Sequence, residues 1–200
     1  MKGYFISTIN DTSDWVVYNN DISTDYKEFL RGKLFSEMKL PLYYHVPKKY
    51  ALNKLKKELV LESSGPELVS KRLKDILVAH NTKGIQFFDV ELYCGEERIE
   101  GFYALNLPYK TKCVDIEKSE YRQLNFDDNN PEYMFYYMKL KEDIFDNDAD
   151  YDIVRCKESH RYIVISERVK TILFEANFKG LQFSDGIDIT PQDRTVYERI

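Results

Sequence analysis

Two stretches of the chain place apolar residues at helical spacing. One begins at Val69 and reads VSKRLKDILVAHNTKGIQFFDV, and the other begins at Ile165 and reads ISERVKTILFEANFKGLQFSDG. Apolar positions that recur every three or four residues are typical of one buried face of a helix. These positions are Leu73, Ile76 and Leu77 in the first stretch and Val169, Ile172, Leu173 and Ala176 in the second. Both stretches therefore predict a short amphipathic helix.

Each predicted helix has a start signal, a stop signal and a strand after it. Ser70 and Ser166 stand at the N-cap position, where a serine hydroxyl accepts a hydrogen bond from an N–H group of the first turn. Gly84 and Gly180 predict the helix ends, because glycine reaches the left-handed conformation without a Cβ penalty. Apolar and polar residues then alternate in IQF and LQF with the period of a half-buried strand.

The two stretches also share eleven identical residues without a gap. Such self-similarity is typical of one structural unit that is used more than once. Upstream, VLESSGPELVS and RCKESHRYIVIS each read as a strand, a polar turn and a second strand. We therefore predict a β-β-α-β unit at residues 58–90 and again at residues 154–186. Two shared pairs have no role in this scheme, namely Arg72 with Arg168 and Gln86 with Gln182.

The remaining elements follow less regular patterns. YFISTI and WVVY predict strands, DISTDYKEFLRG a short helix, and KKYALNKLKKEL a basic amphipathic helix. VELYCGEERIEGFYALNL predicts a hairpin with its turn at 95–97, CVDIEKSEY a short strand, and YMFYYMKL an aromatic strand or a short helix. The fold class that follows is α+β, with two β-β-α-β-like units in mostly antiparallel sheets.

The chain contains no long linker rich in proline, or in glycine and serine. We therefore expect residues 1–200 to form a single compact domain. The alternative is two lobes that share an interface, with residues 1–107 and the first repeated unit in one lobe and residues 108–200 and the second unit in the other.

Composition and charge limit the classes of function. The chain is 43% hydrophobic and 14% aromatic, which is enough to bury a core. Its 29 basic and 34 acidic residues give a net charge of −5, which disfavours nucleic acid or an anionic membrane and favours a basic partner. The three cysteines form no CxxC pair, which argues against a disulfide framework and against a zinc knuckle. MKGYFISTINDTSDW lacks the apolar core of a signal peptide, so we expect a cytoplasmic protein.

An acidic run between the two predicted units is the most conspicuous local feature. It contains Asp146, Asp148 and Asp150, which have the spacing of the first ligands of a calcium loop. The rest of that pattern fails, since the sixth position is Tyr151 and the twelfth is Lys157. The other interpretations are a solvated acidic loop and a docking surface for a basic partner.

The sequence offers no pattern of catalytic or metal-binding residues. His45, His80 and His160 form no H-x-x-x-H or H-E-x-x-H motif, and we expect His80 to cap its helix or to pack at the helix end. No G-x-S-x-G elbow and no glycine-rich phosphate loop occurs, and capping explains the repeated serines. We therefore expect no catalytic residues, no metal site and no cofactor.

Aromatic residues are in surplus, with 16 Tyr and 12 Phe. Tyrosine is a common anchor of protein interfaces, although packing within the protein is the main alternative. Stacking on single-stranded nucleic acid would need neighbouring cations, whereas the neighbourhood of these tyrosines is acidic. The candidate partner-binding residues are Asp127, Asp128, Tyr136, Tyr137, Asp146, Asp148 and Asp150.

Three parts of the chain resemble a known family. They are VSKRLKDIL with KGIQFFDVEL, IEGFYALNL with CVDIEKSEY, and YDIVRCKESHRYIVISERVKTILFEANFKGLQF. Over residues 60–186 the chain resembles a family of bacterial immunity proteins, the eleventh immunity family of polymorphic toxin systems, formerly described as a domain of unknown function. The resemblance implies a non-enzymatic protein, encoded beside a secreted toxin, that binds the toxin and blocks it. It does not imply which activity the toxin has.

Neutralisation of a cognate toxin by stoichiometric binding is therefore the leading hypothesis, and two other functions are compatible with the sequence. One is a hydrolase-like enzyme that reverses toxin damage, with carboxylates or a histidine that only the fold brings together. The other is a regulatory module that binds a small ligand. The sequence leaves the oligomeric state and the identity of the toxin open.

Overall fold

The chain divides into two compact units. The computed structural model describes residues 1–9, 16–38, 41–47, 52–125, 127, 131–145, 150–190 and 193–200. The N-terminal unit is Thr8–Pro108, and the C-terminal unit is Tyr109–Ile200 together with Met1–Ser7. The first residues join the C-terminal unit because β1 (Gly3–Thr8) pairs with β13 (Ile163–Ser166).

The N-terminal unit is built on one sheet. Its strands lie in the order β2-β3-β6-β8-β5-β4, with β7 paired to β6. Strands β3 and β6 run parallel, and the other strand pairs run antiparallel. Its elements are β2 (Val17–Tyr18), α1 (Tyr26–Leu30), β3 (Leu42–Val46), α2 (Leu52–Leu55), β4 (Val60–Leu61), β5 (Leu68–Ser70), α3 (Lys71–Ala79), β6 (Gln86–Cys94), β7 (Glu97–Ile99) and β8 (Phe102–Asn106).

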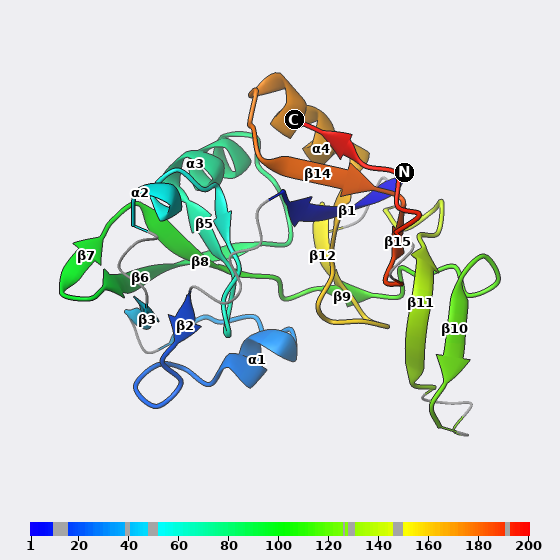
Figure 1. Cartoon of the computed structure of the whole chain (residues 1–200), viewed down its shortest axis with the longest axis horizontal. Coiled ribbons are helices and arrows are strands. Elements are labelled where there is room, and N and C mark those ends of the chain that lie inside the picture. The colour runs from blue at the N-terminus through cyan, green and yellow to red at the C-terminus, as the bar shows by residue number, and fades with distance from the viewer. Residues whose placement is uncertain are drawn as a thin grey trace. The chain divides into compact units, whose positions relative to one another are not determined.

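The C-terminal unit contains a larger sheet in the order β16-β14-β1-β13-β12-β9 and a small sheet in the order β10-β11-β15 (Figure 1). Its core includes Phe5, Phe145, Val154 and Val164. Its further elements are β9 (Lys110–Thr111), β10 (Glu120–Gln123), β11 (Tyr133–Lys139), β12 (Ile153–Cys156), α4 (Glu167–Glu175), β14 (Leu181–Ser184), β15 (Gly186–Asp188) and β16 (Glu198–Arg199). No described helix in the chain is long and apolar enough to cross a membrane.

The predicted α+β class with mostly antiparallel sheets is confirmed. The two similar stretches form β4, β5, α3 and β6 in one unit and β12, β13, α4 and β14 in the other. In the larger sheet of each unit, one further strand lies between the strand that precedes the helix and the strand that follows it. That strand is β8 in the N-terminal unit and β1 in the C-terminal unit, so it comes from different parts of the chain. That one unit is used twice stays a prediction.

Both predicted N-caps are confirmed. The Ser70 hydroxyl accepts a hydrogen bond from Leu73 N, and the Ser166 hydroxyl accepts one from Val169 N, each at 3.3 Å. The predicted glycine stops are wrong in position, because α3 ends at Ala79 and α4 at Glu175.

Asparagine takes the role at the helix ends that the sequence assigned to glycine. Asn81 and Asn177 adopt the left-handed conformation first, with φ of 49° and 51°. Asparagine tolerates that conformation better than most residues do. Gly84 and Gly180, with φ of 83° and 94°, follow in the turn that leads into the next strand. His80 is the C-cap residue of α3, as predicted.

The shared glutamines hold segments that lie outside the repeated stretches. Gln86 donates a hydrogen bond to Phe35 O and accepts one from Phe35 N, at 2.7 and 3.1 Å. Gln182 donates to the hydroxyl of Ser7 at 3.1 Å. Arg168, one of the shared arginines, forms an ion pair with Asp152 at 2.9 Å. These three side chains therefore make contacts inside their own unit.

Two predicted elements differ from the observed ones, and a third had been left open between two forms. The basic helix predicted over residues 48–59 ends earlier than predicted, because α2 ends at Leu55, and residues 48–51 lie outside the described residues. In the segment 113–121, residues 115–119 form a turn, because the Asp115 carboxylate accepts a hydrogen bond from Lys118 N and its carbonyl accepts one from the Ser119 hydroxyl. Only its last two residues, Glu120 and Tyr121, lie in a strand, where they begin β10. The aromatic segment, for which a strand and a helix were both open, forms strand β11.

Candidate partner-binding surface

Two of the candidate residues, Tyr136 and Tyr137, lie on β11 in the middle of the small sheet. Strand β11 pairs antiparallel with β10 on one side and with β15 on the other. Aromatic residues favour strands because their rings pack well on a pleated surface. The small sheet therefore arranges the tyrosine-rich segment between two other strands (Figure 1).

A β-bulge in β11 changes which side chains face the core. Tyr121 pairs with Phe135, whereas the preceding Glu120 pairs with Tyr137, so Tyr136 is an extra residue on β11. Phe135 and Met138 consequently both point inward although they are three positions apart, with exposed fractions of 8% and 0%. The bulge leaves Tyr136 41% exposed.

The inner side of the hairpin carries an aromatic cluster. The ring centroids of Tyr121 and Tyr133 are 4.9 Å apart, and those of Tyr133 and Phe135 are 5.5 Å apart. Phe135 belongs to the core of the C-terminal unit, whereas Tyr121 is 38% exposed. The cluster therefore runs from the core to solvent along the hairpin.

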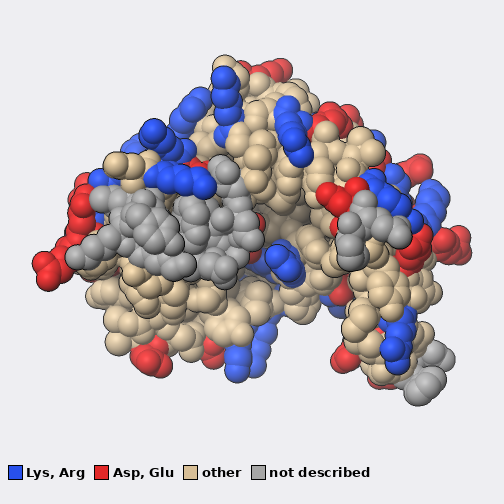
Figure 2. All heavy atoms as spheres, viewed as in Figure 1, with Lys and Arg blue, Asp and Glu red and all other residues tan. Residues whose placement is uncertain are grey.

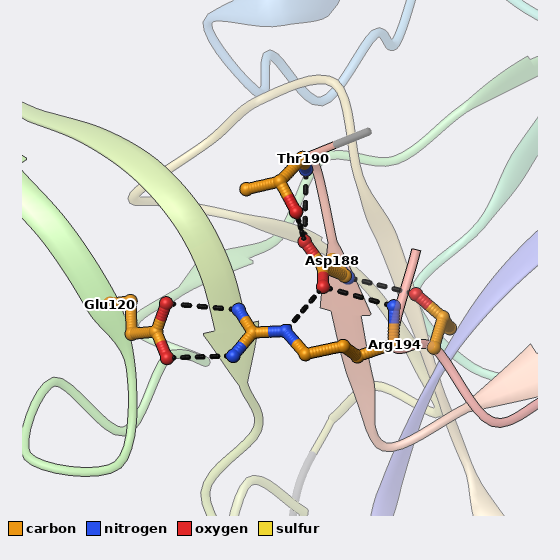
Figure 3. Close-up of polar contacts among 5 residues, drawn as sticks. Glu120, Asp188, Thr190 and Arg194 are labelled. Carbon is orange, nitrogen blue, oxygen red and sulfur yellow. Dashed lines mark hydrogen bonds and ion pairs between the residues drawn. The ribbon is translucent and has the colours of Figure 1, made fainter. Parts of the chain in front are cut away.

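A network of ionic hydrogen bonds joins both edges of the small sheet to the C-terminal segment (Figure 3). Arg194 donates from Nη1 and Nη2 to the two carboxylate oxygens of Glu120 on β10, each at 2.9 Å. The same guanidinium donates from Nε to Asp188 Oδ2 on β15 at 2.5 Å. Thr190 donates from its backbone N and its hydroxyl to Asp188 Oδ1. One arginine thus connects two strands that are not neighbours in the sheet.

These contacts fix the charge states of the network. Hydrogen bonds from the Thr190 hydroxyl and from Arg194 hold the pKa of Asp188 well below its ordinary value. The hydrogen bonds from Arg194 also lower the pKa of Glu120, and the two carboxylates raise the pKa of Arg194. All three groups are therefore charged at neutral pH, and the bidentate geometry adds directional rigidity.

Tyr137 is held in place beside this network. The Arg194 guanidinium lies 5.4 Å from the centroid of the Tyr137 ring. On the neighbouring strand, residue 186 is glycine, and a Cβ at that position would lie 2.3 Å from Tyr137 Oη. Gly186 therefore provides the space that the half-buried Tyr137 side chain occupies.

Exposed apolar side chains gather on this sheet and the segments next to it. Six large ones, each at least 38% exposed, are Tyr121, Leu124, Met134, Tyr136, Ile189 and Val196. Figure 2 shows acidic and basic side chains together over the region of β10 and β11. Exposed apolar residues within a charged surrounding are typical of protein interaction sites.

The other candidate residues lie on different segments of the same unit. Asp127 is exposed in the connection between β10 and β11. Asp150 is exposed in the connection between β11 and β12, next to Tyr151, whose ring packs on Tyr109 and Phe145. Asp128, Asp146 and Asp148 lie outside the described residues, and with them two of the three acidic residues of the candidate calcium loop.

The surroundings of Cys113 and His160 shift the pKa values of these two side chains. Cys113 and Cys156 are buried, and a hydrogen bond to Cys156 together with burial raises the pKa of the Cys113 thiol, which keeps it protonated at neutral pH. Burial and the charges of Lys110 and Arg155 lower the pKa of His160. Among the described residues, no three His, Cys, Asp or Glu side chains converge as metal ligands would.

Comparison with known proteins identifies a family. The chain matches the model of the family described as "Immunity protein family (Imm11)" over residues 8–188. No curated protein matches the chain.

Proposed function

Because the chain belongs to the Imm11 family of immunity proteins, we propose that it protects the cell that makes it by binding one cognate toxin molecule and blocking its activity. Binding would take place in the cytoplasm and would involve no catalytic step. The observation that carries the proposal is the group of exposed apolar side chains on the small sheet of the C-terminal unit. Tyrosines on a rigid sheet bury a large area at a low cost in conformational entropy.

For the docking surface we propose the tyrosines of β11 and the acidic residues of the two connections that come before and after β11 in the chain. The seven candidate residues are Asp127, Asp128, Tyr136, Tyr137, Asp146, Asp148 and Asp150. Tyr136 supplies an exposed ring, and Tyr137 supports the sheet through its contact with Arg194. The net charge of −5 favours a basic toxin, which would be attracted to the acidic connections before contact.

Co-expression tests this function. Cells that produce the toxin encoded beside the gene should stop growing, and growth should return when this protein is also produced. The two purified proteins should elute together in size-exclusion chromatography. Continued killing in the presence of the protein, with no complex in the column, would show that it is not the antagonist of that toxin.

The acidic connection between β11 and β12 supports a prediction about the rate at which the protein associates with the toxin. Changing Asp146, Asp148 and Asp150 together to Asn should slow association about five- to tenfold at low ionic strength, with little change in dissociation. Surface plasmon resonance at two salt concentrations measures both rates. The difference between variant and wild type should shrink at high salt because ions screen the attraction.

A matched control separates local charge from total charge. Asp89, Glu96 and Glu100 are exposed residues of the N-terminal unit. Changing them to Asn, Gln and Gln alters the net charge by the same amount and should leave the association rate within about twofold. Equal slowing in both triple variants would remove the acidic connection from the docking surface.

A further inference from the structure

Strand β10 leaves one of its edges open. The small sheet has the order β10-β11-β15, so β10 pairs with β11 on one side, and no described strand lies on its other side. The outer edge of β15 is covered by the C-terminal segment, where Asp188 N donates to the Thr195 hydroxyl and Arg194 N donates to the Asp188 carboxylate. Within the small sheet, β10 therefore offers the open edge.

The other sheet edges in the described parts of the chain are shorter. The strands at the ends of the two larger sheets, β2, β4, β9 and β16, have two residues each. The hairpin strand β7 has three, of which Glu97 and Arg98 are exposed and charged. Short and charged edges are the usual protection against pairing with another chain. Strand β10 is longer, with four residues that are all exposed; two of them, Glu120 and Arg122, are charged, and none is proline or lysine.

Strand β10 presents its backbone groups in a regular pattern. Leu124 N donates to Glu132 O at 2.8 Å and so extends the ladder by one residue. Hydrogen-bonded and non-hydrogen-bonded pairs alternate in an antiparallel ladder, so Arg122 bonds inward to Met134, its paired residue. The N–H and C=O groups of Tyr121 and Gln123 consequently point out of the sheet, where a further strand would meet them.

The open edge is also held in place before any partner arrives. Arg194 anchors Glu120, the first residue of β10, through two hydrogen bonds of 2.9 Å. Tyr121, in the middle of the strand, packs its ring against Tyr133. An edge that is already rigid loses little conformational entropy when it binds another strand.

We propose that the cognate toxin binds by adding one of its own extended segments to the outer edge of β10. This proposal rests on the proposed function and names its binding mode. The backbone groups of Tyr121 and Gln123 would bond the added strand, as in other recognition modes that extend a sheet. Alternate side chains of the toxin segment would be apolar and pack on the exposed part of the Tyr121 and Tyr133 rings.

A proline substitution tests the edge without disturbing the sheet. Gln123→Pro removes an N–H group that points outward and leaves the bond of Leu124 intact, and proline is tolerated in edge strands at such positions. Gln123→Ala is the matched control, because it removes the same side chain and keeps the N–H group. Isothermal titration with the toxin domain encoded beside the gene should give a dissociation constant at least about tenfold higher for Gln123→Pro. The constant for Gln123→Ala should stay within about twofold of that of the wild type.

Thermal unfolding and circular dichroism check that Gln123→Pro has folded. If it has not, hydrogen exchange on the wild-type protein decides the question. In the complex, the amides of Tyr121 and Gln123 should exchange at least about tenfold more slowly than in the free protein.

Two results would overturn the binding mode while leaving the proposed function intact. For one, the wild-type protein binds the toxin, but Gln123→Pro binds it as tightly as Gln123→Ala does, or the amides of Tyr121 and Gln123 exchange in the wild-type complex as fast as in the free protein. The other is light scattering that shows the free protein as a dimer that Gln123→Pro converts to a monomer, because a second copy would then occupy the edge. If the wild-type protein formed no complex with the toxin domain, the proposed function itself would be contradicted.

Discussion

Replacing Phe183 by alanine should lower the free energy of unfolding by about 3–5 kcal/mol, the usual cost of removing a fully buried phenylalanine. Phe183 is 0% exposed, and its ring centroid lies 5.5 Å from that of Phe174 on helix α4. The cavity would lie between this helix and the sheet beneath it, where relaxation is limited by close packing. Urea unfolding followed by circular dichroism measures the loss.

The corresponding residue of the first similar stretch provides the control. Phe87 matches Phe183 in the aligned sequences, but its side chain is only partly buried. We therefore expect Phe87→Ala to cost about 1–2 kcal/mol, since less surface leaves water on folding. Equal losses for the two variants would contradict the packing described for β6 and β14.

Gly65→Ala should destabilise the N-terminal unit by about 1–3 kcal/mol through overpacking. A Cβ at residue 65 would lie 2.4 Å from Tyr18 Cγ and 2.6 Å from Tyr18 Cβ. Tyr18 cannot withdraw easily, because its N–H bonds the Ser64 hydroxyl at 2.9 Å and its own hydroxyl bonds Thr24 O. Its ring also packs on Tyr44, with the centroids 4.9 Å apart.

Gly101→Ala separates overpacking from backbone strain. Gly101 has φ of +86°, and a Cβ there would meet nothing within 4 Å. The substitution should cost only the strain of the left-handed backbone, about 1 kcal/mol. Thermal unfolding of both variants gives the comparison. If Gly65→Ala were no more destabilising than Gly101→Ala, the close approach of Tyr18 to the turn would be refuted.

Local patterns in the sequence predicted the helices and their caps, because each depends on residues a few positions apart. The serine at each cap and the apolar stripe behind it are sufficient signals. The helix ends were less well predicted, although Asn81 and Asn177 are shared by both stretches. Asparagine in the left-handed conformation is less frequent than glycine, so the later glycines were preferred as the stop.

The bulge in β11 explains why its segment was ambiguous. Phe135 and Met138 are buried and three positions apart, which is also the spacing of a helical face. An extra residue at Tyr136 shifts the phase of the strand, and no local signal in the sequence announces it.

The sheet order and the ionic network depend on residues that are far apart in the chain. Gly3 on β1 pairs with Ser166 on β13, and Arg194 bonds Glu120 across 74 positions. Charge patterns report such pairs only when the partners are neighbours on one element. The candidate site stays a prediction from its tyrosines and acidic residues, and sequence patterns missed Arg194, which joins β10 to β15.

The most direct test of neutralisation by binding is the ratio at which protection is complete. A fixed amount of the toxin domain is mixed with increasing amounts of this protein, and the remaining toxin activity is measured at several times. Tight binding predicts a straight decline that reaches zero at about one protein molecule per toxin molecule and does not change with time. If about one molecule of this protein per hundred toxin molecules gave protection that grew with time until it was complete, the protein would be an enzyme and the account would be contradicted.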